Sequence, residues 1–407
     1  MLEGARKRIV AAVSMHHSCN DGSAVVLPAV FPLLYDSGEL IGNYSDIGDM
    51  ILAGLVTALV FQALVGHFAR TRHSRYYLAF DALMVGAALI LMTRATGLWM
   101  LVVFFMMMRM GTSIYHPVGI SWISSLFHGR DLDRAMGFQS AFGNIGVLVA
   151  FAFTGILAES FGWRAPLLIW GGINLAAVLA GLLLTRGTID AEEAARQKEE
   201  EKEPVSWKAA FLGLLPFVPM ALLGGLGWGV AINYAPSLLN HRLGVPMSAT
   251  GLIMSVWMGA GTLAAFFYGR ISSLLSRGRT MVYAYAAITA VALIFGLGRN
   301  VPLAIAAFAL FGVALFVTYP ANLSFIGNAV SRRNRTAAFS ITSNMMIIGN
   351  SVFSFISGRL SDAFGINTPF LMLGCGSLAV LAYLLMMIRT GRIEAEGCLF
   401  ARTDPPA

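Results

Sequence analysis

The sequence is poor in charged residues and in cysteine. Only 12% of its 407 residues are charged, against about 25% in a typical soluble domain, and 57% are hydrophobic. This composition excludes an ordinary water-soluble domain. The three cysteines, Cys19, Cys375 and Cys398, are odd in number, and their spacing suggests neither a metal site nor a disulfide framework. The Gly-x-x-x-x-Gly-Lys-Ser/Thr loop that binds nucleotide phosphates is also missing, which argues against direct use of ATP.

Long apolar runs fill most of the chain. A helix rises about 1.5 Å per residue, so about 20 apolar residues cross the roughly 30 Å of hydrocarbon in a bilayer. Such runs are too long for core strands, and the alternating pattern of a membrane β-barrel is absent. The sequence therefore predicts an all-α membrane protein with twelve transmembrane helices. These helices are predicted over residues 9–34, 46–66, 76–93, 97–126, 135–158, 164–185, 210–239, 247–270, 280–298, 301–328, 336–358 and 368–388.

One long polar connection, residues 186–208, interrupts the apolar pattern close to the middle of the chain. It contains an acidic run at 199–203 and is typical of a solvated helix or a flexible linker. This connection predicts a cytoplasmic charged linker between an N-terminal six-helix bundle at 1–185 and a C-terminal six-helix bundle at 209–390. A cytoplasmic tail follows at 391–407. No cleavable signal peptide is expected, because polar residues interrupt the first apolar run.

Lysine and arginine are distributed unevenly among the predicted loops. With the N-terminus in the cytoplasm, 22 of the 28 basic residues fall in cytoplasmic loops or in the two termini. Five fall on the opposite side, and Arg109 lies inside a predicted helix. The positive-inside rule therefore predicts a multi-pass protein of the cytoplasmic (inner) membrane with both termini in the cytoplasm. The same bias explains the net charge of +7 without a nucleic-acid partner.

The two halves of the chain repeat each other at an offset near 203 residues. Residues 115–117, Tyr-His-Pro, match residues 318–320, Thr-Tyr-Pro. Residues 155–162 match residues 358–365 in their two glycines, their leucine and their acidic residue. A repeat of this size predicts two pseudo-symmetric bundles of the same topology with a central cavity between them.

Two of the predicted helices carry ionisable residues at a depth where hydrocarbon is expected. The first contains His17 and Asp21, and the fourth contains Arg109 and His116. A charge at the centre of a bilayer costs roughly 2.5–3.5 kcal/mol on insertion scales, so such residues are seldom kept without a use. Residues four or seven positions apart share one face of a helix, which places His17 with Asp21 and Arg109 with His116.

We interpret these four residues as a polar site inside the membrane. Arg109 is a fixed cation, whereas Asp21 and the histidines can bind and release a proton. Asp21, with His17, is the candidate proton carrier, and Arg109 either pairs with Asp21 or holds an anionic group of a ligand. The alternative is that the four residues only tie the two helices together by hydrogen bonds. A metal on His17, Asp21 and His116 is disfavoured by the nearby arginine, so neither a metal nor a cofactor is expected.

Other polar and aromatic side chains in the predicted helices are candidates for binding a substrate in the cavity. Each of them can instead serve packing or hydrogen bonding between helices. The candidates are Asn20, Tyr115, Gln139, Trp228, Asn233, Tyr234, Tyr319 and Asn344.

Three segments of the chain together resemble one family of membrane proteins. Over nearly its whole length the sequence is similar to the major facilitator superfamily, and within it to the fosmidomycin-resistance type of exporter. The segments that carry the resemblance are His17 with Asp21 and Leu27-Pro28-x-x-x-Pro32, then Tyr115-His116-Pro117-x-Gly119, then Gly155 to Arg164, which resembles the superfamily's outer loop after helix 5.

Two acidic residues of the superfamily pattern are missing. In the loop after the second helix, Gly66 is followed by Arg70 where the acid belongs. In the loop after the eighth helix, Gly269 is followed by Ser273 at the acidic position. Asp81, near the inner end of the third helix, is a candidate substitute for the first of these acids.

The resemblance implies secondary active transport of a small molecule by alternating access, most simply efflux in exchange for protons. Proton-coupled uptake of a small organic anion uses the same parts and stays open. A non-transporting intramembrane receptor or enzyme is the alternative from a different class, although no enzymatic activity is expected. The expected partners are a small-molecule substrate, protons and the lipid bilayer, and the expected state is a monomer.

Overall fold

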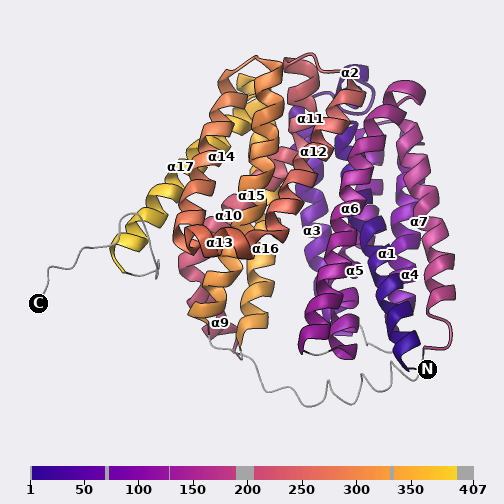
Figure 1. Cartoon of the computed structure of the whole chain (residues 1–407). Helices are drawn as coiled ribbons and strands as arrows, with labels where there is room; N and C mark the ends of the chain where they lie inside the picture. Colours follow the sequence, from indigo (N-terminus) through magenta and orange to yellow (C-terminus); the bar gives the residue numbers. More distant parts are fainter. Residues whose placement is uncertain (1, 69–72, 128, 189–205, 331–333, 392–407) are drawn as a thin grey trace, which may run out of the picture. The chain divides into compact units, whose positions relative to one another are not determined.

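The computed structural model describes residues 2–68, 73–127, 129–188, 206–330 and 334–391. Within these ranges the chain forms helices joined by short turns and contains no strand, which confirms the predicted all-α class (Figure 1). Eleven of the described helices are long and apolar enough to cross a membrane. The predicted linker, the tail and the basic residues Arg70, Arg72, Arg332 and Arg333 lie wholly or largely outside the described residues.

The helices fall into two compact units. Unit 1 comprises Met1–Glu203 and Pro246–Ser255, and unit 2 comprises Pro204–Val245 and Val256–Ala407. The helices before the linker are α1 (Leu2–Ala29), α2 (Phe31–Ser37), α3 (Tyr44–Phe68), α4 (Ser74–Met92), α5 (Leu98–Leu126), α6 (Gly129–Phe161) and α7 (Arg164–Leu184). Those after it are α9 (Trp207–Leu214), η2 (Leu215–Phe217), α10 (Val218–Asn233), α11 (Ala235–Ser237), η3 (Leu238–Arg242), α12 (Met247–Phe266), α13 (Tyr268–Leu275), α14 (Arg277–Leu297), α15 (Val301–Ala329), α16 (Arg335–Phe364) and α17 (Thr368–Arg389).

Twelve spans are predicted, and α1 is the one that is not among the eleven described helices long and apolar enough to cross a membrane. Its 28 residues are sufficient in length, but His16, His17, Asn20 and Asp21 make it more polar than the other spans. All four side chains point into unit 1 rather than to its surface, with at most partial exposure. The polar character of α1 is therefore compatible with a spanning helix, because neighbouring helices cover it.

Proline and glycine explain where the observed helices differ from the predicted ones. The predicted helix 9–34 breaks at Val30, and Pro32 stands in the first turn of α2. Proline is tolerated there because backbone N–H groups of the first turn have no partner within the helix. The predicted helices ending at 158 and 358 continue to Phe161 and Phe364. Gly162 (φ 82°) and Gly365 (φ 99°) follow them with a backbone conformation that favours glycine. The repeated motif therefore lies largely within helices rather than in a loop.

Two other predicted spans are also divided. The predicted helix 210–239 becomes α9, η2, α10, α11 and η3, with Pro216, Pro219 and Pro236 each in the first turn of a new segment. The predicted helix 247–270 ends at Phe266, and the short α13 follows it. These breaks follow from proline chemistry for the first span, and the structure offers no single residue type that explains the second.

Unit 1 is built around α1, which packs against α5, α6 and α7. Gly146 of α6 allows the backbone of α1 at Ser18 to approach so closely that a Cβ would overlap the Ser18 carbonyl oxygen. Gly22 of α1 faces the ring of Trp170 of α7 in the same way. Close helix approach through small residues is the usual packing mode inside a membrane. It brings the polar side chains of α1 within reach of α5 and α6.

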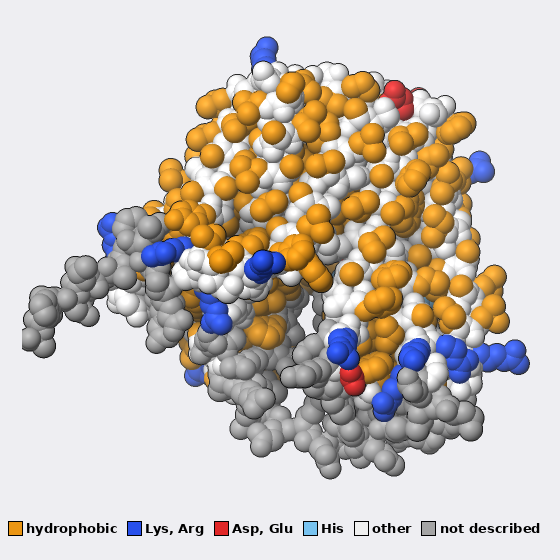
Figure 2. All heavy atoms as spheres, viewed as in Figure 1, with side chains coloured by type: hydrophobic (Ala, Val, Ile, Leu, Met, Phe, Trp, Pro, Cys, Tyr) orange, Lys and Arg blue, Asp and Glu red, His pale blue; other side chains and the backbone are white. Residues whose placement is uncertain are grey.

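Large apolar side chains cover the outer surface of the spanning helices (Figure 2). Trp99, Leu179, Leu263 and Leu297 are each more than half exposed. Exposed apolar surface of this extent is unfavourable in water and favourable against lipid chains.

Candidate functional site

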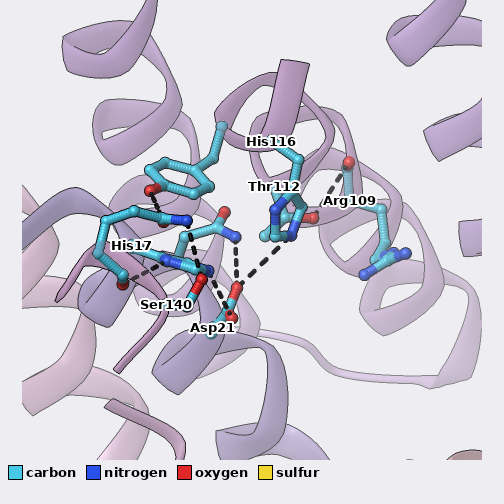
Figure 3. Close-up of polar contacts among 9 residues, drawn as sticks. His17, Asp21, Arg109, Thr112, His116 and Ser140 are labelled. Carbon is cyan, nitrogen blue, oxygen red and sulfur yellow. Dashed lines mark hydrogen bonds and ion pairs between the residues drawn. The ribbon is translucent and has the colours of Figure 1, made fainter. Parts of the chain in front are cut away.

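The candidate site of unit 1 is centred on the carboxylate of Asp21 (Figure 3). Its Oδ2 lies 3.0 Å from Nε2 of His17, one turn earlier on α1, and its Oδ1 lies 3.7 Å from Nε2 of His116 on α5. The Asn20 amide donates a hydrogen bond to Oδ1 over 3.0 Å. The side chain of His116 is 49% exposed and that of Asp21 is 27% exposed. The site can therefore be reached by water and small solutes.

The imidazole of His17 is held by α5 and α6. Its Nδ1 lies 2.8 Å from the main-chain oxygen of Gln139 on α6. One face of the ring stacks on Tyr115 of α5, with centroids 4.5 Å apart. Gly143, one turn beyond Gln139, stands directly against the ring, and a Cβ at this position would lie within 2.8 Å of three ring atoms. The orientation of His17 is thus set by two helices other than its own.

These contacts assign the protons of the pair. A main-chain oxygen can only accept, so Nδ1 of His17 carries a hydrogen and donates it to Gln139. At 3.0 Å, Nε2 and Asp21 Oδ2 must also share a hydrogen, because two lone pairs would repel at this distance. The pair therefore holds one proton between Nε2 and Oδ2, either as imidazolium with carboxylate or as imidazole with carboxylic acid.

Two predicted cavity residues, Tyr115 and Gln139, instead support His17 from inside the bundle. The Tyr115 hydroxyl donates to Gln139 Oε1 over 2.9 Å, and the Gln139 amide donates to Ser140 Oγ over 3.0 Å. Tyr115 and Gln139 are both buried, as is Asn20. In this structure these three side chains make contacts within unit 1 and do not line an exposed surface, because all three are buried.

The expected ion pair between Arg109 and Asp21 is not formed in the described part of the chain. Figure 3 shows the Arg109 guanidinium on the far side of His116 from the Asp21 carboxylate. The Asp21 oxygens are already occupied by His17, Asn20 and His116. Arg109 is half-buried, and its backbone oxygen accepts a hydrogen bond from Thr112. The arginine is therefore a cation beside the site rather than a part of the Asp21 pair.

The predicted cavity residues of unit 2 divide into structural and exposed ones. The Asn233 amide donates to Ser354 Oγ over 3.0 Å, and the hydroxyl of the fully buried Tyr234 donates to the Ser354 main-chain oxygen over 2.5 Å. Both residues therefore tie the α10–α11 region to α16. Trp228 packs in an aromatic cluster with Trp257 and Phe316. Tyr319, 41% exposed, and Asn344, half-buried, keep accessible side chains.

Asp81, the candidate substitute for the missing acid after the second helix, is buried in the first half of α4. It lies inside α4 with 1% of its surface exposed, and its Oδ1 has no hydrogen-bond partner. A carboxylate of a cytoplasmic charge network must reach basic side chains in a loop, and Asp81 is covered by neighbouring helices instead. The suggestion that it replaces the missing acid after the second helix stays a prediction, because residues 69–72 of that loop lie outside the described residues.

Sequence reasoning did not find two parts of the site. Gly143 carries no side chain, so its identity does not predict that the ring of His17 lies against it. The oxygen that orients His17 belongs to the main chain of Gln139, which every residue type possesses. For Ser354, a polar residue at the middle of a predicted span was an available signal.

The sequence matches the profile of the Major Facilitator Superfamily over residues 17–346 and 217–397. The chain belongs to the major facilitator superfamily. It is 23% identical over 390 residues to an uncharacterised MFS-type transporter of Mycobacterium tuberculosis, covering 93% of this chain and 88% of the relative. It is also 23% identical over 302 residues to the multidrug efflux protein YfmO of Bacillus subtilis, covering 71% of this chain and 69% of that protein.

Solved structures of the superfamily share the fold. A bacterial homologue of the human lysosomal transporter Spinster superposes with a TM-score of 0.74 at 16% identity, covering 98% of this chain and 99% of that one. The nucleoside transporter NupG superposes with a TM-score of 0.73 at 15% identity, covering 94% and 99%. This member of the superfamily is therefore a multi-pass integral membrane protein of a transporter family.

Proposed function

We propose that this chain is a proton-coupled secondary transporter that exports a small organic molecule across the cytoplasmic membrane by alternating access. The observation that carries the proposal is the 3.0 Å contact between His17 Nε2 and Asp21 Oδ2 beside the half-exposed His116. Similarity to the multidrug efflux protein YfmO supports export, as does the resemblance to fosmidomycin-resistance exporters.

Release of the shared proton changes the contacts of α1. Without it, the lone pair of His17 Nε2 faces the Asp21 carboxylate, and the 3.0 Å contact becomes repulsive. His17 cannot turn freely to relieve this repulsion, because α6 holds Nδ1 and Tyr115 of α5 covers the ring. The protonation state of the pair therefore acts on the packing of α1 against α5 and α6, which links proton binding to helix movement.

Exchange with protons requires that the substrate bind the deprotonated site. A substrate that offers a cationic or hydrogen-donating group to Asp21 competes directly with the proton, and this competition gives antiport. His116, half-exposed and 3.7 Å from Asp21, offers a further group for a substrate to contact. We therefore propose Asp21 and His116 as shared contacts of proton and substrate, with Tyr319 and Asn344 as candidate contacts from unit 2.

Uptake of an organic anion with protons is the second candidate, and Arg109 favours it. The guanidinium has no ion-pair partner within the described residues, so an anionic substrate group can bind it. A deprotonated Asp21 competes with such an anion for Arg109, so the anion binds best when Asp21 holds its proton. That order gives symport.

The proposal is tested by proton movement in everted membrane vesicles that contain the protein. A respiratory proton gradient is established, and the vesicles are challenged with a cationic dye and, separately, with a phosphonate antibiotic. Asp21→Asn is expected to abolish compound-driven proton movement. Asp131→Asn removes an exposed carboxylate at the start of α6 and is the matched control.

Each outcome of the vesicle experiment has a separate meaning. Discharge of the gradient by the dye in the wild-type protein supports antiport, whereas proton exit that requires antibiotic loaded inside the vesicles supports symport. Unchanged proton movement in Asp21→Asn would exclude Asp21 as the proton carrier. A stoichiometric metal in the purified protein would favour the intramembrane enzyme instead.

The remaining expectations are part of the same proposal. We place the protein in the inner membrane with both termini in the cytoplasm, since 22 of its 28 basic residues then lie on the cytoplasmic side. We also propose that it acts as a monomer without a cofactor or a nucleic-acid partner. Labelling of single cysteines added at each terminus, in intact and permeabilised cells, checks the orientation.

A further inference from the structure

A second carboxyl group lies within unit 1 and takes no part in the contacts of Asp21 described above. Asp81 of α4 is 1% exposed, and its Oδ1 has no hydrogen-bond partner. The main chain of α4 at Asp81 packs closely against Gly111 of α5, which lies between Arg109 and His116 along that helix. Asp81 therefore lies at the level of the candidate site, behind it rather than at a membrane surface.

The ionisable groups around Asp81 are all acidic. The helix α1 presents Cys19 and Asp21 to it, and α5 presents Tyr115. The third helix packed against α4 is α7, which has no ionisable residue after Arg164 at its start. No ion pair to Asp81 is found among the described residues. A buried carboxylate without a cation is strongly unfavourable, so Asp81 is stable here as a carboxylic acid.

Asn20 bonds one of the two carboxyl groups, that of Asp21, and has a second polar atom without a partner. Its amide nitrogen donates to Asp21 Oδ1 over 3.0 Å, while its own Oδ1 is buried without a donor. A carboxylic acid differs from a carboxylate in having an O–H to donate. Protonation therefore turns Asp81 from a group that only accepts hydrogen bonds into one that can also donate one.

We propose that Asp81 is a second proton-binding group of the transport cycle, coupled to Asp21 by the charge of that carboxylate. The inference rests on the proposed function, in that protons drive transport. In the loaded state one proton lies in the His17–Asp21 pair and the other on Asp81. When Asp21 has released its proton to water, its negative charge holds the second proton on Asp81.

The second proton leaves after the charge of Asp21 is neutralised again by a substrate group or by Arg109. The O–H bond of Asp81 then breaks, the electron pair stays on the carboxylate, and the proton passes to water. Two protons are thus released in sequence for each cycle. A single coupling carboxyl would release only one.

The test uses infrared difference spectra of the full-length protein in lipid vesicles as the pH is changed. Wild type, Asp81→Asn, Asp21→Asn and the surface control Asp131→Asn are compared. We expect the C=O band of a buried carboxylic acid to disappear in Asp81→Asn and to lose intensity as the pH rises in the wild type. Proton release measured with a soluble dye is expected to fall from two per protein to one in Asp81→Asn.

The alternatives give different spectra. A band that is lost in Asp81→Asn but is constant at every pH in the wild type would make Asp81 a structural acid and overturn the proposal. If Asp81→Asn has the same C=O bands as the wild type, Asp81 is ionised in the wild type, and this also overturns the proposal. If Asp81→Asn does not fold, Asp81→Glu is used in its place, and a shift of the C=O band relative to the wild type identifies the band of residue 81. Failure of the proposed function is detected by a different result: proton-coupled transport would then be intact in Asp21→Asn.

Discussion

The substitution Gly143→Ala places a methyl group on the ring of His17. A Cβ built at this position lies 2.6 Å from Nε2, 2.7 Å from Cε1 and 2.8 Å from Cδ2, whereas ordinary contacts begin at 3.4 Å. The ring must therefore move by about 0.8 Å, the difference between 3.4 and 2.6 Å. It cannot do so freely, because Nδ1 is bonded to Gln139 and Nε2 to Asp21.

The expected loss follows from those two bonds. The near-equal distances to three ring atoms place the Cβ over the face of the ring, so the ring is pushed out of the plane that contains its bonds to Gln139 and Asp21, and both hydrogen bonds are bent. A hydrogen bond to a charged group contributes about 1.5–3 kcal/mol. At about 1.4 kcal/mol for each factor of ten, Gly143→Ala is expected to reduce proton-coupled transport by roughly 10- to 100-fold.

Gly137→Ala is the matched control on the same helix. A Cβ at Gly137 has no atom within 4 Å, so alanine is expected to leave the site intact and to stabilise α6 by up to about 1 kcal/mol. The assay is compound-driven proton movement in everted vesicles across a range of pH, together with the thermal unfolding of both variants. A Gly143→Ala protein with the rate and pH dependence of the wild type would refute the assigned position of His17. Adding His17→Ala to Gly143→Ala removes the overlap and is expected to restore stability without restoring coupling.

Two further substitutions separate support of the fold from support of the site. Gln139→Leu removes the acceptor of the buried Tyr115 hydroxyl and is expected to lower the free energy of unfolding by about 1–3 kcal/mol, yet its main-chain oxygen still orients His17. The pH dependence of transport is therefore expected to change less in Gln139→Leu than in Gly143→Ala. An equal change would contradict the role of the Gln139 main-chain oxygen in orienting His17. Tyr234→Phe removes the hydroxyl that bonds Ser354 and is expected to cost about 1 kcal/mol in thermal unfolding with transport unchanged. Loss of transport at full stability would instead make Tyr234 a substrate contact.

Local spacing allowed part of the site to be predicted from the sequence. His17 and Asp21 are four residues apart on one helix, and the structure places their side chains in direct contact. The same reasoning put Arg109 and His116 on one face of α5, but only His116 reaches Asp21. Contacts between helices depend on the rotation and depth of each helix, and helical periodicity contains neither.

The fold was predictable to the same extent and for a related reason. Length and apolar composition identify a spanning helix, because every backbone group must be bonded within the hydrocarbon region. The ends of the helices are set by single residues, as Gly162 and Gly365 show for α6 and α16. The breaks at Pro216 and Pro236 likewise divide a run that hydropathy alone treats as continuous.

The internal repeat gives an argument that the buried charges serve more than packing. At the offset of 203 residues, the positions that match His17 and Asp21 are Met220 and Gly224. The pair α10–α16 is the most extensively packed helix pair of unit 2, as α1–α6 is of unit 1, and again a glycine, Gly225, lies against the backbone of the partner helix. Uncharged groups suffice to join that pair, because the Asn233 amide bonds Ser354. The same helix pairing is therefore achieved without an ionisable residue, so packing alone does not explain why α1 retains a carboxylate and two histidines inside the membrane.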